Sequence, residues 1–206
     1  MKSKTLWSLA VAGVCLVLGG QAAQAAGDAE EGKKKFFTCA GCHAFEGYSN
    51  AVPNYPVPRI GGQHAEVILA ALKSYKDGDR KHGSMEGNAN SWTQKDWEDI
   101  AAYASKKRLS NENNPISGNP AAGKAKAEEK ACAGCHGEDD GKSTAPNPRL
   151  AGQYEGYLVK ALKDYKKGVR KNPIMNGFAE SLTEQEIKDI SAYFSSQKRG
   201  VVTLSD

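Results

Sequence analysis

Apolar residues recur at helical spacing in two segments of the chain that share one pattern. In residues 63–77 they fall on one side of a helix: Val67, Ile68, Ala71, Leu72 and Tyr75. The pattern returns over residues 153–167, and a glycine that can stop a helix follows each segment, namely Gly78 and Gly168. The spacing predicts an amphipathic helix in each segment that ends at the glycine.

Helix-start signals predict two further helices in each half. Asp28, with Glu31 three residues on, opens the segment GDAEEGKKKFFT, and Asn119 followed by Pro120 opens GNPAAGKAKAEEKA. A capping box opens a later helix in each half: Thr93 with Asp96, and Thr183 with Glu186. No segment shows the sustained alternation that is typical of a β-strand. The sequence therefore predicts an all-α protein with about three to four helices in each half.

The two halves are copies of one domain. Residues 59–108 align without a gap onto 149–198, with 21 identities in 50 positions. Upstream the offset grows from 90 to 93, so the first copy carries three extra residues in the loop FEGYSNAVPNYPVP. A polar stretch rich in Asn, Gly and Pro separates the copies. The sequence predicts domains over 26–109 and 118–206, joined by a linker over 110–117.

The first 25 residues have the composition of an export signal. Two lysines precede an apolar run over residues 6–18, and Ala23-Gln24-Ala25 supplies a small-x-small cleavage pattern. A membrane anchor is the alternative, but the run is shorter than the roughly 20 residues that a span needs. Cys15 could be a lipoprotein acceptor, although a valine rather than a small residue precedes it. We expect cleavage of residues 1–25, near Ala25, and export of the remainder.

The charge balance argues against nucleic acid as a partner. Removing residues 1–25 lowers the count of basic residues from 28 to 26, against 24 acidic residues, so the formal charge falls from +4 to +2. Binding to phosphates needs clustered positive charge that displaces counterions. The one compact basic run, Lys33 to Lys35, is typical of a solvated helix face.

The pentapeptide CAGCH occurs at residues 39–43 and again at 132–136, and it contains all four cysteines that remain after export. Its two thiols and its imidazole are spaced i, i+3 and i+4, which places them on one face of a helical turn. C-x-x-C-H is the signature of c-type haem attachment. Three alternatives are less consistent with the sequence. A thioredoxin-like redox pair belongs near a βαβ pattern, which this sequence lacks. A zinc site usually needs four ligands, whereas each half offers two Cys and one His locally, and two disulfides would leave both histidines unexplained. Domains of this size also have small cores and ordinarily need a disulfide, a metal or another bound group to stabilise them.

Met85 and Met175 are candidates for the sixth iron ligand, one in each half. The repeat aligns them, and each is expected in a long loop between helices, where a core residue would be out of place. His82 lies three residues from Met85 and is a minor rival, while His64 has no histidine counterpart in the second half. Ligation by His and Met fills both axial positions and raises the potential of the iron. That combination favours one-electron transfer over substrate turnover.

With these motifs, residues 27–200 resemble the dihaem cytochrome c4 family, which has two class I cytochrome c domains in tandem in the bacterial periplasm. The resemblance implies two cytochrome c-like domains, each built around a covalently bound haem c. It implies thioether bonds at four cysteines: Cys39, Cys42, Cys132 and Cys135. It also implies the axial pairs His43 with Met85 and His136 with Met175, with imidazole protons accepted by the carbonyls of Pro58 and Pro148 in PRIGGQ and PRLAGQ.

The predicted function is one-electron transfer without an enzymatic activity of its own. The resemblance implies a periplasmic carrier between a quinol-oxidising cytochrome bc complex and a terminal oxidase or reductase, with peripheral association to such membrane complexes. The alternative is a dihaem subunit of a dehydrogenase, for instance a flavoprotein that oxidises sulfide. A peroxidase would need an open haem face, which paired methionines disfavour. The segments MEGNANSW and MNGFAESL differ, so the two haems are expected to differ as well.

Overall fold

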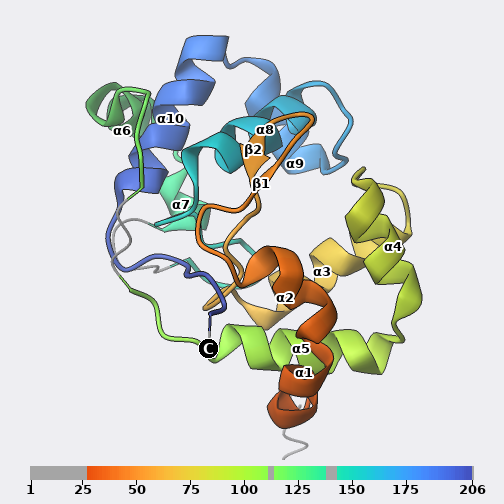
Figure 1. Cartoon of the computed structure of the whole chain (residues 1–206). Coiled ribbons are helices and arrows are strands. Elements are labelled where there is room, and N and C mark those ends of the chain that lie inside the picture. Colours follow the sequence, from red (N-terminus) through yellow and green to blue (C-terminus); the bar gives the residue numbers. More distant parts are fainter. Residues whose placement is uncertain (1–26, 111–113, 138–142, 206) are drawn as a thin grey trace, which may run out of the picture.

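The computed structural model describes residues 27–110, 114–137 and 143–205, which form two groups of helices side by side (Figure 1). The first group contains α1 (Ala29–Lys35), α2 (Phe37–His43), α3 (Ala65–Lys76), α4 (Gly83–Ser91) and α5 (Gln94–Ser105). The second contains α6 (Pro120–Glu129), α7 (Ala133–His136), α8 (Glu155–Lys166), α9 (Pro173–Glu180) and α10 (Glu184–Ser196). The protein is mostly helical, as predicted.

Two parts of the sequence predictions fall outside the described residues. These are the export signal, with its cleavage point near Ala25, and residues 111–113 of the linker. Among the helices that the structure describes, none combines the length and the apolar character that crossing a membrane requires.

The predicted helix boundaries depend on local hydrogen bonds that form in the structure. Asp28 caps α1 by accepting the backbone N–H groups of Glu30 and Glu31. Both capping boxes form, at the start of α5 and at the start of α10. Gly78 and Gly168 follow α3 and α8 with φ of +78° and +68°, a left-handed conformation that glycine adopts without steric cost. The stop signals read from the sequence are confirmed.

In each half, the first and last helices cross in close contact at a glycine. A Cβ atom on Gly32 would lie 1.9 Å from the backbone oxygen of Asp99, and one on Gly123 would lie 1.8 Å from that of Asp189. Only glycine lets α1 approach α5, and α6 approach α10, this closely. The cores beside these crossings combine residues of three helices; the first contains Phe36, Ile68, Ile100, Ala101 and Ala104, and the second contains Ala127, Leu158, Ile187, Ile190 and Phe194.

Two segments differ from the sequence predictions. The stretches around Met85 and Met175, expected as loops, contain the short helices α4 and α9. The loop with three extra residues contains a small antiparallel hairpin of β1 (Ser49–Asn50) and β2 (Tyr55–Pro56). Strands of two residues are too short to show alternation, so the pattern could not reveal them.

The halves contact each other through the hairpin and through the C-terminal segment. In Figure 1 the hairpin extends beside α8, and the Cδ atom of Pro56 lies within 2.9 Å of the Cβ position of Gly156. The chain after α10 returns to the first half, where Val202 forms a bridge with Gly61 and Leu204 enters the core. A second bridge, Ser110 with Gly200, brings the ends of α5 and α10 to one side of the molecule.

A reciprocal pair of hydrogen-bonded contacts lies between the halves. Gln153 donates from Nε2 to the Arg59 backbone oxygen (2.8 Å) and accepts the Arg59 N–H at Oε1 (3.0 Å). Gln63 makes the same two bonds to the backbone of Arg149, at 3.1 and 2.9 Å. The contact therefore has an approximate twofold symmetry that matches the sequence repeat.

Candidate haem sites

Each pentapeptide forms a helical turn that ends at its histidine. All five residues of CAGCH lie within α2 in the first half, while α7 covers the last four of its five residues in the second. His43 Nδ1 lies 2.9 Å from the Pro58 carbonyl oxygen, and His136 Nδ1 lies 3.0 Å from that of Pro148. A carbonyl oxygen only accepts, so Nδ1 carries the proton in both rings. The Nε2 lone pair of each imidazole is thereby left for a metal.

Both imidazoles are held in the neutral form that binds metal ions. Burial lowers the pKa of His43 and outweighs the proline carbonyl, which acts in the opposite direction. Burial also lowers the pKa of His136, again against its proline carbonyl. A neutral ring with a fixed tautomer is ready to bind iron without first losing a proton.

The four cysteines of the two pentapeptides lie at two levels of exposure. Cys39 and Cys132 are partly buried, and this burial raises the pKa of both thiols. Cys42 and Cys135 are exposed. In each half the two thiols therefore precede the histidine on one helical turn, one beside the core and one toward solvent. A planar ring that is bonded at two points along one edge could satisfy both.

The two methionines occupy equivalent positions, each in the first turn of a short helix. The Met85 backbone N–H is bonded by the ring Nδ1 of His82 (3.4 Å), and the Met175 N–H by the side-chain oxygen of Asn172 (3.0 Å). Met85 is half-buried and packs against a cluster that includes Trp97. The short helices fix the methionine backbones more firmly than the expected loops would.

The two remaining histidines have other roles in the structure. His82 is the N-cap of α4: Nδ1 accepts from Met85, and Nε2 lies 3.2 Å from the Asn50 side-chain oxygen. His64 precedes α3, and its Nε2 lies 2.8 Å from the Ser143 carbonyl oxygen across the contact between the halves. Both ring nitrogens of His82 are engaged, which favours Met85 over its rival.

Sequence reasoning missed some polar residues near these sites. The indole N–H of Trp97 is buried and has no hydrogen-bond partner among the described residues, although its cluster contains Met85. Gln63 and Gln153, which the repeat aligns, contact the backbone of the opposite half. Their position in PRIGGQ and PRLAGQ, five residues after the prolines, was the available signal.

The residues present fit a haem c in each half. Two thiols stand on one helical turn with a neutral imidazole whose free nitrogen is available, and a thioether lies in the same half. A bound haem c supplies reversible one-electron chemistry at its iron. Its apolar ring would also add to a small core.

Comparisons with known proteins agree with this description. A model of the Cytochrome c family matches residues 29–106 and 120–198. Cytochrome c4 of Pseudomonas aeruginosa is 35% identical over 182 residues, which is 83% of this chain and 89% of that protein. The structure of Acidithiobacillus ferrooxidans cytochrome c4 matches with a TM-score of 0.67 and 32% identity, over 78% of this chain and 99% of its own.

A larger protein also contains this fold. Thiosulfate dehydrogenase of Marichromatium purpuratum matches with a TM-score of 0.70 and 27% identity, over 82% of this chain but only 40% of its own. The tandem family match and the full-length relatives together settle the classification. The chain belongs to the dihaem cytochrome c4 family, with two tandem cytochrome c domains that each bind a haem c covalently, and it is an electron carrier.

Proposed function

We propose that the protein is exported to the periplasm and carries one electron on each of two haems with His and Met axial ligands. The ligand pairs are His43 with Met85 and His136 with Met175, and thioether bonds form at the cysteines Cys39, Cys42, Cys132 and Cys135. The observation that carries the proposal is the paired bond from each imidazole to a proline carbonyl. This bond leaves the second ring nitrogen of each histidine, Nε2, free to bind a metal ion.

The protein's own groups would tune the iron rather than take part in a reaction with substrate. The carbonyls of Pro58 and Pro148 hold the imidazole protons and increase the basicity of the opposite ring nitrogens. A soft thioether as the sixth ligand favours the ferrous state and raises the potential. With both axial positions filled, an electron can be exchanged while small ligands such as peroxide are excluded.

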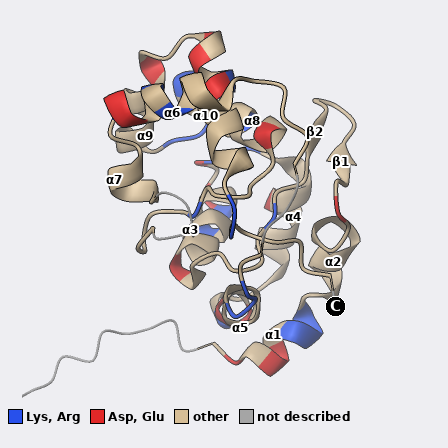
Figure 2. Cartoon of the chain, turned by 90° about the vertical axis from the view of Figure 1, so that its left-hand side faces the viewer, with Lys and Arg blue, Asp and Glu red and all other residues tan. Residues whose placement is uncertain are grey.

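The donor and the acceptor that we propose are a quinol-oxidising cytochrome bc complex and a terminal oxidase or reductase, which the carrier meets at the membrane surface. Figure 2 shows basic and acidic residues near one another on helices of both halves, such as α1 and the region of α6. Mixed charge suits short-lived contacts with proteins better than binding to nucleic acid.

A redox titration of the purified protein, followed by absorbance, tests the proposal. Two low-spin haems with methionine charge-transfer bands are expected, and each should be reduced by one electron. The reduced protein should not turn over peroxide. A high-spin ferric signal in either half of the unaltered protein, or a single covalently bound haem, would refute the His/Met assignment.

The match to thiosulfate dehydrogenase supports a second candidate, a dihaem electron-accepting subunit of a dehydrogenase. In that protein the matched region is 40% of a longer chain, so the fold occurs there joined to further sequence. Purification from the native source separates the two candidates. A stoichiometric partner that reduces the haems with thiosulfate or sulfide would favour the subunit, and a lone chain reduced by the bc complex would favour the carrier.

A further inference from the structure

The segments PRIGGQ (58–63) and PRLAGQ (148–153) begin at one haem site and end at the other half of the molecule. Each opens with the proline whose carbonyl accepts the imidazole proton of its own half. Each closes with a glutamine that binds the backbone of the other half. The contact of the proline with the histidine explains the first residue of each motif but not its last residue, the glutamine.

The contact to the first half is made by Gln153, whose side chain is buried. Its Oε1 accepts the N–H of Arg59 at 3.0 Å and also the N–H of Tyr154 at 3.1 Å. Its Nε2 donates to the Arg59 carbonyl oxygen at 2.8 Å. Three hydrogen bonds thus fix the amide group on both sides of Arg59, which is itself only 2% exposed.

The contact to the second half is made by Gln63 in the same way. Its Oε1 accepts the N–H groups of Arg149 (2.9 Å) and of His64 (3.1 Å), and its Nε2 donates to the Arg149 carbonyl oxygen at 3.1 Å. Gln63 and Gln153 are 7% and 4% exposed, so both contacts are shielded from water. Buried hydrogen bonds of this kind are strengthened by the low local dielectric.

Each glutamine shares one peptide group with the haem-binding histidine of the opposite half. The Pro58 carbonyl and the Arg59 N–H belong to a single planar amide. His43 donates to the oxygen of this amide, and Gln153 accepts from its nitrogen. A hydrogen bond at the N–H polarises the amide and makes its oxygen a better acceptor. The same chain of bonds links Gln63, through the Pro148–Arg149 amide, to His136.

We propose that Gln153 is a positioning residue for the first haem and Gln63 for the second, so that each half tunes the haem of the other. This proposal rests on the proposed ligation by His43 and His136. A better acceptor at the proline carbonyl makes the imidazole a stronger donor to iron, which stabilises the ferric state. Loss of a glutamine should therefore raise the potential of the haem in the opposite half.

The experiment compares Gln153→Met and Gln63→Met in the holoprotein. Methionine keeps the length of the side chain and removes the bonds to the backbone of the other half. Replacing Met85 or Met175 by His, in separate variants, assigns the two waves of the redox titration, because each change lowers one potential. Gln153→Met should then raise the potential of the first-half haem more than that of the second, and Gln63→Met should do the reverse.

Gln197→Met is the matched control, because Gln197 is equally buried at 4% exposure, yet its amide atoms have no hydrogen-bond partner among the described residues. Gln197→Met should not shift the midpoint potential of one haem more than that of the other. A second measurement is hydrogen exchange of the His43 and His136 ring N–H groups in the reduced protein. Gln153→Met should speed exchange at His43, and Gln153→Glu, which keeps an acceptor for Arg59 N–H, should restore slow exchange.

The outcomes distinguish this proposal from the proposed function. If the unaltered protein lacks two low-spin His/Met haems, the ligand assignment fails. If both haems are present and each Gln→Met variant shifts the haem of its own half, or shifts both haems equally, the crossed positioning is wrong. Unchanged exchange at His43 in Gln153→Met, together with an unchanged potential of the first-half haem in that variant, would also overturn it, and so would exchange in Gln153→Glu that is as fast as in Gln153→Met.

Discussion

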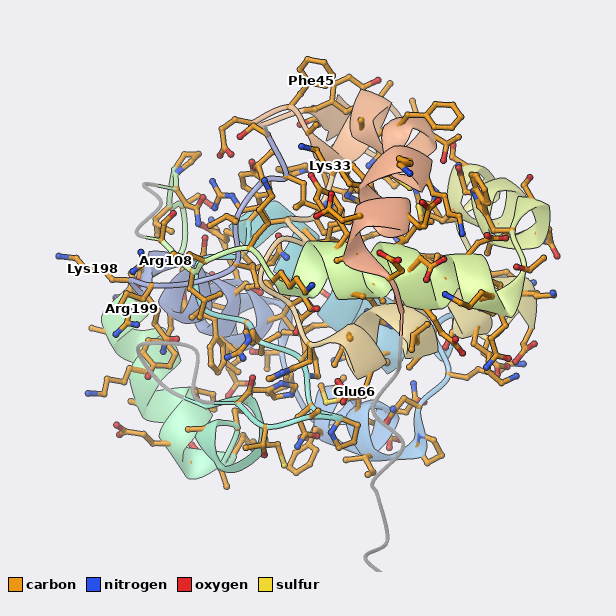
Figure 3. All side chains as sticks on the ribbon, turned by 90° about the horizontal axis from the view of Figure 1, so that it is seen from below. Lys33, Phe45, Glu66, Arg108, Lys198 and Arg199 are labelled. Atoms are coloured by element: carbon orange, nitrogen blue, oxygen red, sulfur yellow. The ribbon has the colours of Figure 1, made fainter. Side chains whose placement is uncertain are left out.

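The two halves share one scaffold but expose apolar side chains on different sides of it. In the first half, Phe37 and Phe45 are 71% and 61% exposed; Phe37 is the first residue of the CAGCH helix α2, and Phe45 lies two residues beyond its end. Phe45 extends outward from the ribbon in Figure 3. In the second half, Ile174 and Phe178, which are 69% and 46% exposed, flank Met175 on α9. Duplication has kept the CAGCH turns and their proline contacts, while the outer faces have diverged, so the two halves present different apolar surfaces.

Removal of both thiols from one half should produce the largest difference between the halves, in haem content and in folding. Cys39→Ala/Cys42→Ala removes both proposed attachment points of the first haem, and Cys132→Ala/Cys135→Ala removes those proposed for the second. Each variant should lose one of the two haems and the folding of that half, because a domain of this size lacks a sufficient core without its ring. Intact mass and the haem absorbance per chain measure the loss. Retention of two covalent haems by either variant would contradict the expectation.

Removal of one methionine side chain, a proposed sixth ligand, should have the next largest effect, on the midpoint potential of a single haem. Met85→Ala should give a high-spin ferric signal in one haem and lower its midpoint potential by an appreciable part of the roughly 0.8 V range that axial ligands span. His82 should not take over, because both of its ring nitrogens are engaged. Electron paramagnetic resonance and a redox titration measure the two effects.

Met175→Ala is the matched control, because its N-cap Asn172 offers no imidazole. Both alanine variants should show the same high-spin signal. A low-spin bis-imidazole signal from Met85→Ala alone would show that His82 can ligate iron. His82→Asn, which copies the cap of the second half, should leave both haems low-spin, since Asn is a favoured N-cap.

The halves also differ in how a lysine of the first helix meets the last helix. Lys35 binds Asp96 and the buried Asp99, both at 2.6 Å, whereas the equivalent Lys126 binds Glu186 at 2.9 Å. Burial acts to raise the pKa of Asp99, but hydrogen bonds from lysines outweigh it and hold this pKa well below its usual range. The bond from Lys35 lowers the pKa of Asp96 to about 2.

Lys35→Met should therefore lower the free energy of unfolding of the first half at neutral pH, because it leaves the buried carboxylate of Asp99 without one of its lysine partners. Lys126→Met should have a smaller effect on the second half, because its partners are more exposed. The depressed carboxyl pKa values stabilise the fold above the unfolded pKa of about 4, and this stability is lost as the pH falls through the folded values. Denaturant unfolding between pH 7 and pH 2 should show the gap between wild type and Lys35→Met closing in acid. A constant gap would contradict the linkage.

Much of this fold is encoded locally and could be predicted. Capping boxes, stop glycines and the repeat depend on residues a few positions apart, and CAGCH carries its chemistry in five residues. The helices around Met85 and Met175 are not evident from the sequence pattern because they are short, and α4 also has few apolar positions. The helix α4 reads GSMEGNANS, and its start is fixed by the cap at His82 rather than by periodicity. Glutamine contacts between the halves depend on how two domains dock, which the pattern within one domain does not reveal.

The smallest expected effect concerns the contact between the hairpin and α8, for which the corresponding helix of the first half, α3, has no equivalent glycine. Gly156 in α8 faces Pro56 of the hairpin, whereas its counterpart in α3 is Glu66, an exposed residue labelled in Figure 3. Replacing a helical glycine by alanine gains roughly 1 kcal/mol of helix propensity. At Gly156 the new Cβ would lie 2.9 Å from Pro56 Cδ, so the hairpin must move. Gly156→Ala alone should change the free energy of unfolding by little.

In the background Pro56→Ala the obstructing Cδ atom is gone, and Gly156→Ala should then stabilise the second half by roughly 1 kcal/mol. The double-mutant cycle thus measures the steric conflict between Pro56 and a Cβ at position 156 as a coupling energy. Glu66→Ala, at the matching position of the first half, should stay within about 0.5 kcal/mol of wild type, since Glu66 is exposed among the residues that the structure describes. A full gain from Gly156→Ala in the presence of Pro56 would mean that the hairpin does not press on α8. The extra residues of the first copy would then have no part in joining the halves at this point.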